Sequence, residues 1–208
     1  MDIQVKICGL TNVEDALAAV EAGADLLGFV LWEKSPRSVT IETAREIARR
    51  LPPATPRVGV FVDARVEKVM FSLRICDFSA LQFHGQETPS FCQQFNVMTI
   101  KAFRVRDAAS VQALAGYDTD AFLLDSQVEG QPGGTGETFD WSLAAAAKKF
   151  DKPIFLAGGL TPQNVAAAVR AAQPFAVDVS SGVEAAPGKK DRQKMRDFIA
   201  AVREASGK

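Results

Sequence analysis

The chain is poor in the residues that bind transition metals and form disulfides. It has a single histidine, His84, and three cysteines, Cys8, Cys76 and Cys92, with no CxxC spacing. One histidine nearly excludes multi-histidine zinc or iron sites, so we expect no metal site. An odd number of widely spaced cysteines indicates a reduced, cytoplasmic protein.

Charge and hydropathy argue against two further kinds of partner. Lys and Arg number 24 against 25 Asp and Glu, and the formal net charge is -1. A nucleic-acid or anionic-membrane surface therefore has no electrostatic support at the level of the whole chain. The basic stretch "PGKKDRQKMR" at 187–196 is a candidate anion site, although most of its charges are interpreted as a solvated helix face. No segment reaches the roughly 18 apolar residues of a membrane span, and the start "MDIQVK" lacks the build of a signal peptide.

What is present is a regular alternation of strand-like and helix-like segments. Apolar runs of strand length lie at 3–9, 24–31, 57–62, 79–85, 97–105, 120–125, 152–159 and 175–182. Helical patterns follow them at 12–23, 40–51, 64–75, 88–95, 107–117, 141–150, 161–172 and 191–205. No change of composition marks a linker, so we expect a single domain over residues 1–208.

Eight strand-then-helix units predict a (β/α)8 TIM barrel. The loops must be short, because the chain has 208 residues against roughly 250 for a typical barrel. The rival is an open doubly wound sheet, which usually carries one glycine fingerprint after its first strand. Here the glycine-rich loops follow the sixth, seventh and eighth strands instead, which favours the barrel.

The upper ends of several strands carry residues suited to chemistry. In a barrel of this kind, active sites lie at the carboxyl ends of the strands. Alternation in the first strand turns Lys6 and Cys8 toward the interior, with Cys8 at the rim. Asp125 ends the sixth strand, Asp178 lies near the top of the eighth, and His84 tops the fourth. We expect these side chains to converge on one mouth.

Each of these residues also has a purely structural interpretation. Cys8 by itself is more often a small buried hydrophobe than a working thiol, although Gly9 beside it permits close backbone approach to a ligand. Asp125 and Asp178 are equally suited to capping a turn. A lone carboxylate at a barrel mouth is nevertheless where an acid or base is placed. His84 alone is interpreted as structural.

Two short motifs after the last strands predict a phosphate site. "LAGGL" contains Gly158 and Gly159, and "VSSG" contains Ser180, Ser181 and Gly182. Backbone amides of such loops, with a helix beginning beyond them, form the usual phosphate cradle of a barrel. The alternative is a pair of tight turns. The stretch 129–137, "EGQPGGTGE", is either a lid or a turn.

Taken together, the motifs resemble the phosphoribosylanthranilate isomerase family of tryptophan biosynthesis. The matching segments are "VKICGLT", "GFV…KSPRSV", "VGVFV", "LQFHG", "LLD…GGTGETFDW", "LAGGLTPQNV" and "VDVSSGVE..PGKKD", in order along the whole chain. The departures are small: Ser38 replaces a frequent aromatic, Phe83 stands where leucine is commoner, and Trp32 occupies a loop that usually carries a smaller aromatic.

The resemblance implies an Amadori rearrangement of N-(5-phosphoribosyl)anthranilate into the corresponding aminoketose. Asp125 matches the general acid that opens the furanose ring, and Cys8 matches the general base that removes the C2′ proton. Arg37 matches the group that holds the anthranilate carboxylate. Asp178 matches the contact on the ribose side, with His84 among the substrate-binding residues. No cofactor is implied, because the Schiff base forms within the substrate.

The resemblance does not by itself settle the pKa of Cys8, the rival functions or the oligomeric state. A useful thiol base needs its thiolate favoured, and Lys6, on the same side of the strand as Cys8, is our candidate for lowering the thiol pKa. Activity on the aminoaldose of the histidine pathway is a rival function. A catalytically silent barrel acting as a scaffold is another, although such a relative should have lost some of these residues. Monomer and homodimer are both expected states.

Overall fold

The structure, a computed structural model, describes residues 2–125 and 141–207. Eight parallel strands form a closed barrel in the order β1 to β8, and β1 pairs with β8 to complete it. Their bounds are β1 Gln4–Cys8, β2 Leu26–Val30, β3 Arg57–Phe61, β4 Ala80–Phe83, β5 Met98–Arg104, β6 Ala121–Asp125, β7 Ile154–Ala157 and β8 Ala176–Val179. The predicted TIM barrel is confirmed.

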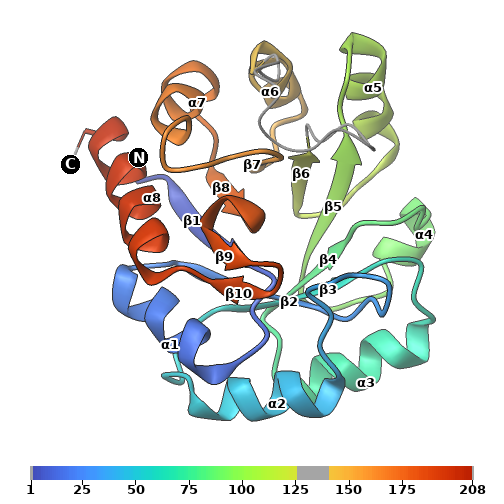
Figure 1. The fold of residues 1–208 in the computed structure, drawn as a ribbon. Helices are drawn as coiled ribbons and strands as arrows, with labels where there is room; N and C mark the ends of the chain where they lie inside the picture. The colour runs from blue at the N-terminus through green and yellow to red at the C-terminus, as the bar shows by residue number, and fades with distance from the viewer. Residues whose placement is uncertain (1, 126–140, 208) are drawn as a thin grey trace.

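The helices lie around the outside of this barrel (Figure 1). The α-helices are α1 Val13–Ala22, α2 Ile41–Arg50, α3 Val66–Cys76, α4 Pro89–Cys92, α5 Ala108–Gln112, α6 Ser142–Ala147, α7 Val165–Ala172 and α8 Arg192–Ala205. Short 3-10 turns are η1 Ala113–Gly116, η2 Lys148–Phe150 and η3 Ser181–Val183. Within the described ranges, no helix combines the length and the apolar character that crossing a membrane requires.

The alternation of each strand divides the core into two parts. Outward-facing residues such as Ile7, Phe29 and Leu81 pack against the helices in one large cluster. Inward-facing residues such as Val58 and Leu123 form a second cluster inside the barrel. The barrel centre is therefore packed, as is usual for this fold, and chemistry is confined to its upper end.

Local signals in the sequence predict both ends of α1 correctly. The Asn12 side chain accepts a hydrogen bond from the backbone N–H of Asp15, and Gly23 ends the helix with φ of 95°. Glycine adopts the left-handed backbone conformation at this position without steric cost, because it has no Cβ atom. Thr40 caps α2 in the same way as Asn12, accepting from the backbone of Thr43.

Three segments differ from the sequence-based expectation. The helix expected over 88–95 is reduced to α4, which ends at Cys92, and the helix expected from 161 begins at Val165. Between β8 and α8, where a loop was expected, the chain forms a small antiparallel hairpin of β9 Glu184–Ala186 and β10 Lys189–Lys190. This hairpin has a role in the site described below. The stretch 129–137, expected to be a lid or a turn, lies outside the described residues.

Candidate active site

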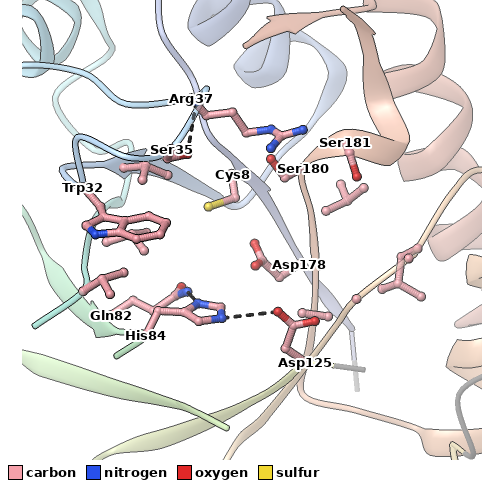
Figure 2. Close-up of a pocket in the computed structure, with 18 of the residues that line it drawn as sticks. Cys8, Trp32, Ser35, Arg37, Gln82, His84, Asp125, Asp178, Ser180 and Ser181 are labelled. Atoms are coloured by element: carbon pink, nitrogen blue, oxygen red, sulfur yellow. Dashed lines mark hydrogen bonds and ion pairs between the residues drawn. The ribbon is translucent and has the colours of Figure 1, made fainter. Parts of the chain in front are cut away.

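A cavity of about 320 Å³ opens at the carboxyl ends of the strands, and Figure 2 shows its lining. That volume lies in the range of small-molecule sites, roughly 300–1,000 Å³. Nine of the ten residues proposed from the sequence line it: Cys8, Arg37, His84, Asp125, Gly158, Gly159, Asp178, Ser180 and Ser181. Trp32, Ser35, Gln82 and Arg104 line it as well.

Gly182 is the tenth proposed residue, and it does not line the cavity. A Cβ atom at this position would lie 1.9 Å from the backbone oxygen of Leu160. The glycine therefore allows the loop after β8 to pack directly against the loop after β7. Ser180, Ser181, Gly158 and Gly159, which these two loops carry, line the same cavity.

Cys8 ends β1 with its side chain toward the cavity, and it is a free thiol exposed by only 7%. Its partner in the adjacent strand is Gly28. A Cβ on Gly28 would lie 2.7 Å from Cys8 Sγ and 3.1 Å from Lys6 Nζ. The absence of a side chain at position 28 thus makes the space in which the thiol and the ammonium group lie together.

Lys6 is fully buried beneath Cys8 and pairs with Asp178, its register partner on the adjacent strand β8. Its Nζ donates a hydrogen bond of 2.8 Å to Asp178 Oδ1. Burial disfavours the charged ammonium, but the attraction of Asp178 and of Cys8 outweighs it, so the pKa of Lys6 is raised. The lysine therefore brings a fixed positive charge to the floor of the site.

The thiol of Cys8 has a raised pKa, and the main cause is burial. Lys6 lowers the pKa of Cys8, as expected, but Asp178 acts in the opposite direction and burial prevails. Lys6 therefore moderates the effect of burial without making Cys8 a thiolate of low pKa. The other two cysteines are also buried, and burial raises the pKa of each to about 11.

Replacing Lys6 by methionine should raise the pKa of Cys8 further, because the one strong positive neighbour is removed while Asp178 remains. The limb of the kcat/KM profile that rises with pH as the Cys8 thiol ionises should move to higher pH. Thiolate ultraviolet absorbance, taken as a difference against Cys8→Ser, measures the same shift in the free protein. Asp178→Asn is the opposite control, since it removes a negative charge and should lower the pKa of Cys8. An unchanged titration in Lys6→Met contradicts this electrostatic argument.

A second polar chain crosses the cavity from β4 to β6. Gln82 Nε2 lies 3.0 Å from His84 Nδ1, and His84 Nε2 lies 3.3 Å from Asp125 Oδ2. If the Gln82 amide donates to Nδ1, the proton of the neutral ring is on Nε2 and points to Asp125. Gln82 is itself buried, and among the described residues its Oε1 has no hydrogen-bond partner.

Arg37 reaches the cavity from the loop after β2, and part of its guanidinium is already engaged within the chain. Its Nε donates to Glu184 Oε1 at 2.8 Å, and its Nη2 donates to Glu184 Oε2 at 2.7 Å. One edge of the guanidinium is therefore occupied by a carboxylate of the same chain. The Nη1 end remains for a ligand, since no hydrogen bond to a described residue involves it.

The loops after β7 and β8 have the geometry of an anion site. Gly158 and Gly159 have φ of 87° and 62°, and β8 is followed directly by η3, which begins at Ser181. Turns that contain left-handed residues direct successive backbone N–H groups to one side, where they attract anions. Residues 2–125 and 141–207 contain no group of three or more His, Cys, Asp or Glu side chains placed to hold a metal ion.

Of the residues in or beside the cavity that the sequence interpretation does not identify, Gln82, Glu184 and Lys190 make the contacts that bear most on the site. Strand alternation places Gln82 on the same face as His84, two residues later, and that signal was available. Glu184 and Lys190 lie in the recognised segment "VSSGVE..PGKKD". Nothing in that spacing shows that Glu184 pairs with both Lys190 and Arg37.

Comparison with known proteins places the chain in a family. The family model described as "N-(5'phosphoribosyl)anthranilate (PRA) isomerase" matches residues 5–201. A protein named N-(5'-phosphoribosyl)anthranilate isomerase from Pelobacter propionicus is 52% identical over 97% of this chain and 96% of its own length. One of the same name from Pseudomonas fluorescens is 51% identical, over 99% and 98%.

Solved structures agree with the sequence relatives. The phosphoribosyl anthranilate isomerase of Thermotoga maritima superposes with a TM-score of 0.92 at 43% identity, covering 97% of this chain and 99% of the other. A second structure, of the same kind of enzyme in complex with reduced 1-(o-carboxyphenylamino)-1-deoxyribulose 5-phosphate, has a TM-score of 0.88 at 41% identity, with coverage of 97% and 99%. From the family model, the near full-length identity and the shared barrel, this chain belongs to the N-(5'-phosphoribosyl)anthranilate isomerase family.

Proposed function

We propose that the chain converts N-(5-phosphoribosyl)anthranilate into 1-(2-carboxyphenylamino)-1-deoxyribulose 5-phosphate, an aldose-to-ketose isomerisation in tryptophan biosynthesis. The observation that carries the proposal is one cavity lined by a carboxyl group from β6 and a thiol from β1. The reaction needs an acid and a base acting on different atoms of one pentose. A cavity between those two strand ends meets that need.

The first step assigns Asp125 as the general acid. Its proton passes to the furanose ring oxygen while the C1′–O bond breaks, and the nitrogen lone pair forms the C1′–N double bond of a protonated Schiff base. His84 contacts Asp125 Oδ2 at 3.3 Å, longer than the roughly 2.7–2.9 Å of a strong charge-assisted pair. The contact orients the carboxyl group toward the cavity.

The second step assigns Cys8 as the general base. The thiolate takes the C2′ proton, and the C–H electrons move to neutralise the iminium nitrogen, which gives an enolamine. A proton then returns to C1′ as the C2′ hydroxyl proton leaves, and the ketone results. Because burial raises the pKa of Cys8, the thiolate is scarce at neutral pH. It is also a stronger base once formed, which suits removal of a carbon-bound proton.

The remaining lining groups are assigned to binding. Arg37 holds the anthranilate carboxylate through its Nη1 end, and Asp178 contacts the ribose hydroxyls. The Gly158–Gly159 and Ser180–Ser181 loops bind the phosphate, in keeping with anion binding by exposed backbone amides. The three free, buried cysteines fit the reducing cytoplasm expected from the sequence. The dimeric enzyme of Thermotoga maritima described in a related structure fits one of the two expected oligomeric states.

Loss of substrate fluorescence on adding the chain to phosphoribosylanthranilate tests the function. An enzyme accelerates that loss in proportion to its concentration, whereas a silent barrel does not. A parallel assay with the aminoaldose of the histidine pathway separates the two isomerase activities. Absence of turnover with the first substrate, or preference for the second, overturns the proposal.

Arg37→Ala should raise KM by about tenfold or more, because hydrogen bonds to charged groups contribute about 1.5–3 kcal/mol. kcat should change little, since the residue touches no reacting atom. In the variant Glu184 still pairs with Lys190 at 2.9 Å, so no buried carboxylate is left alone. Steady-state fluorescence assays give both constants, and an unchanged KM contradicts the assignment.

A further inference from the structure

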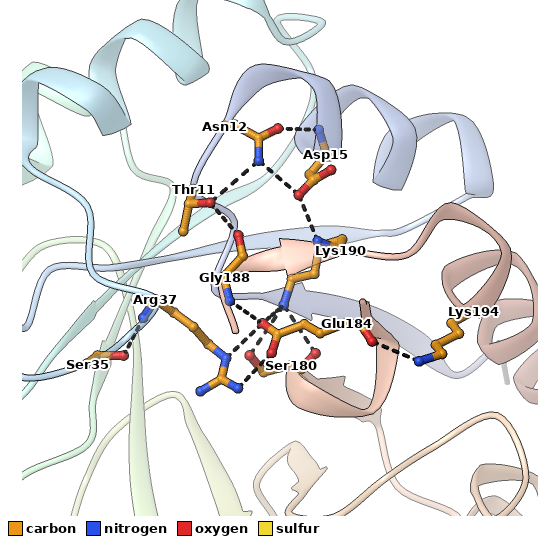
Figure 3. Close-up of polar contacts among 10 residues, drawn as sticks. All are labelled: Thr11, Asn12, Asp15, Ser35, Arg37, Ser180, Glu184, Gly188, Lys190 and Lys194. Atoms are coloured by element: carbon orange, nitrogen blue, oxygen red, sulfur yellow. Dashed lines mark hydrogen bonds and ion pairs between the residues drawn. The ribbon is translucent and has the colours of Figure 1, made fainter. Parts of the chain in front are cut away.

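The β9–β10 hairpin brings a buried ion pair to the edge of the cavity. Glu184 and Lys190 face each other in the hairpin register, and their side chains are 5% and 0% exposed. Figure 3 shows the pair between Arg37, from the loop after β2, and Ser180, at the end of β8. Neither residue has a part in the proton transfers assigned above. Buried charges of this kind cost free energy unless they are paired. The groups that contact them therefore indicate their role.

Glu184 is surrounded by donors on every side. Its Oε1 accepts from Arg37 Nε at 2.8 Å, from Lys190 Nζ at 2.9 Å and from the backbone N–H of Gly188 at 3.3 Å. Its Oε2 accepts from Arg37 Nη2 at 2.7 Å. Burial opposes ionisation, but the hydrogen bonds from Arg37 and Lys190 outweigh it and lower the pKa of Glu184. One carboxylate is therefore shared by two cations at this edge of the cavity.

Lys190 extends the same network to the other anion site. Its Nζ donates to the backbone oxygen of Ser180 at 3.1 Å and lies 3.4 Å from Ser180 Oγ. Its backbone N–H donates to Asp15 Oδ2 at 2.8 Å, near the start of α1. The hairpin turn is also anchored, because Thr11 Oγ1 donates to the backbone oxygen of Gly188. Arg37 is therefore held by Glu184, and Lys190 by Glu184, Ser180 and Asp15.

We propose that Glu184 and Lys190 are positioning residues for the two anionic ends of the substrate. Glu184 occupies the Nε–Nη2 edge of Arg37, which leaves the Nη1 end presented to the anthranilate carboxylate. Lys190 fixes Ser180, and with it the loop that faces the phosphate. The inference rests on the proposed function, since it concerns how the same site recognises that substrate.

A network that only holds the hairpin in place predicts a different result from one that positions ligands. A structural role affects the free energy of unfolding and weakens both ends of the site together. A positioning role affects the two ends unequally, because Glu184 is the residue that contacts Arg37, whereas Lys190, although paired with Glu184, is the residue that contacts Ser180. Two fragments of the substrate, anthranilate and inorganic phosphate, report on the ends independently as competitive inhibitors.

The test compares Glu184→Gln and Lys190→Met with the parent protein. Glu184→Gln keeps the shape but removes the charge, so anthranilate inhibition should weaken by about tenfold while phosphate inhibition stays within about twofold. Lys190→Met should give the reverse pattern. kcat should stay within about threefold in both. Asp25→Asn is the matched control. It removes a carboxylate that pairs with Arg203 at 2.7 Å, and neither residue lines the cavity.

The outcomes separate the inference from the function. If the parent protein isomerises phosphoribosylanthranilate and Glu184→Gln leaves anthranilate inhibition unchanged, or weakens both fragments equally, the inference is wrong and the function stands. If the parent protein shows no turnover, the function fails and the inference with it. Should Glu184→Gln fail to fold, Glu184→Asp keeps the charge beside Lys190 but shortens the reach to Arg37. The same selective loss of anthranilate inhibition is then expected, and its absence overturns the inference.

Discussion

Cys8→Ser should lower kcat by at least about two decades, because positioned acid–base groups contribute roughly 10²–10⁴ in rate. That loss equals about 3 kcal/mol of transition-state stabilisation at ~1.36 kcal/mol per decade. KM should stay within a few-fold, since serine fills nearly the same space beside Gly28 and leaves the Lys6–Asp178 pair in place. The physical reason is basicity: a serine hydroxyl does not ionise in the range in which a thiol does.

The pH profile distinguishes a lost base from a disturbed site. In the parent protein kcat/KM should rise with pH as the Cys8 thiol ionises, and the raised pKa of Cys8 places this limb above the ordinary range of a thiol. In Cys8→Ser the limb should disappear. A local distortion would lower the whole curve and keep its shape.

Cys76→Ser and Cys92→Ser are matched controls. Both are free and buried, as Cys8 is, but neither lines the cavity. Each should leave kcat unchanged and lower only the thermal midpoint of unfolding, since a hydroxyl replaces a sulfur in an apolar contact. Near-normal turnover in Cys8→Ser would falsify the assignment of the thiol as the base.

The barrel was predictable from sequence because its signals are local. Each strand-length apolar run precedes a helical pattern, and the parallel pairing of β1 to β8 follows from that order. The position of Cys8 at the rim follows from alternation along one strand. Asp125 and His84 follow from the rule that chemistry lies at the carboxyl ends of barrel strands.

The parts that escaped prediction depend on contacts between distant residues. Arg37 and Glu184 are 147 positions apart, so the sequence presents Arg37 as a free clamp and hides the carboxylate that holds it. The basic stretch 187–196 was interpreted mainly as a solvated face. Lys190 within it is buried, because β10 turns its side chain toward Glu184 and Ser180. The short β9 and β10 have no apolar alternation to reveal them.

The same non-local packing explains why the predicted effect of Lys6 on the pKa of Cys8 is only partly confirmed. The sequence places the two side chains on one face of β1, and Lys6 does lower the pKa of the thiol. It does not reveal that Asp178 faces the same ammonium group at 2.8 Å. A charge that already has a partner acts less on a third group, and burial then determines the sign of the net shift.

Asp125→Asn should likewise lower kcat by at least about two decades, because an amide has the shape of the carboxyl group but no acidic proton to give to the ring oxygen. KM should change little. Asp118→Asn is the control: this carboxylate pairs with Lys152 at 2.8 Å, and its side chain is 81% exposed. It should retain full activity.

His84 provides a readout that separates loss of the proton from displacement of the site. It is the single histidine of the chain, so the ring nitrogen signals of a ¹⁵N-histidine sample belong to it alone. With Gln82 donating to Nδ1, the proton should be on Nε2 in the parent protein. It should stay there in Asp125→Asn, because the amide oxygen still accepts it. An inactive variant with an unchanged ring then assigns the loss to the missing acid. A changed tautomer together with weaker binding would assign it to geometry instead, and Asp125 would be a positioning residue.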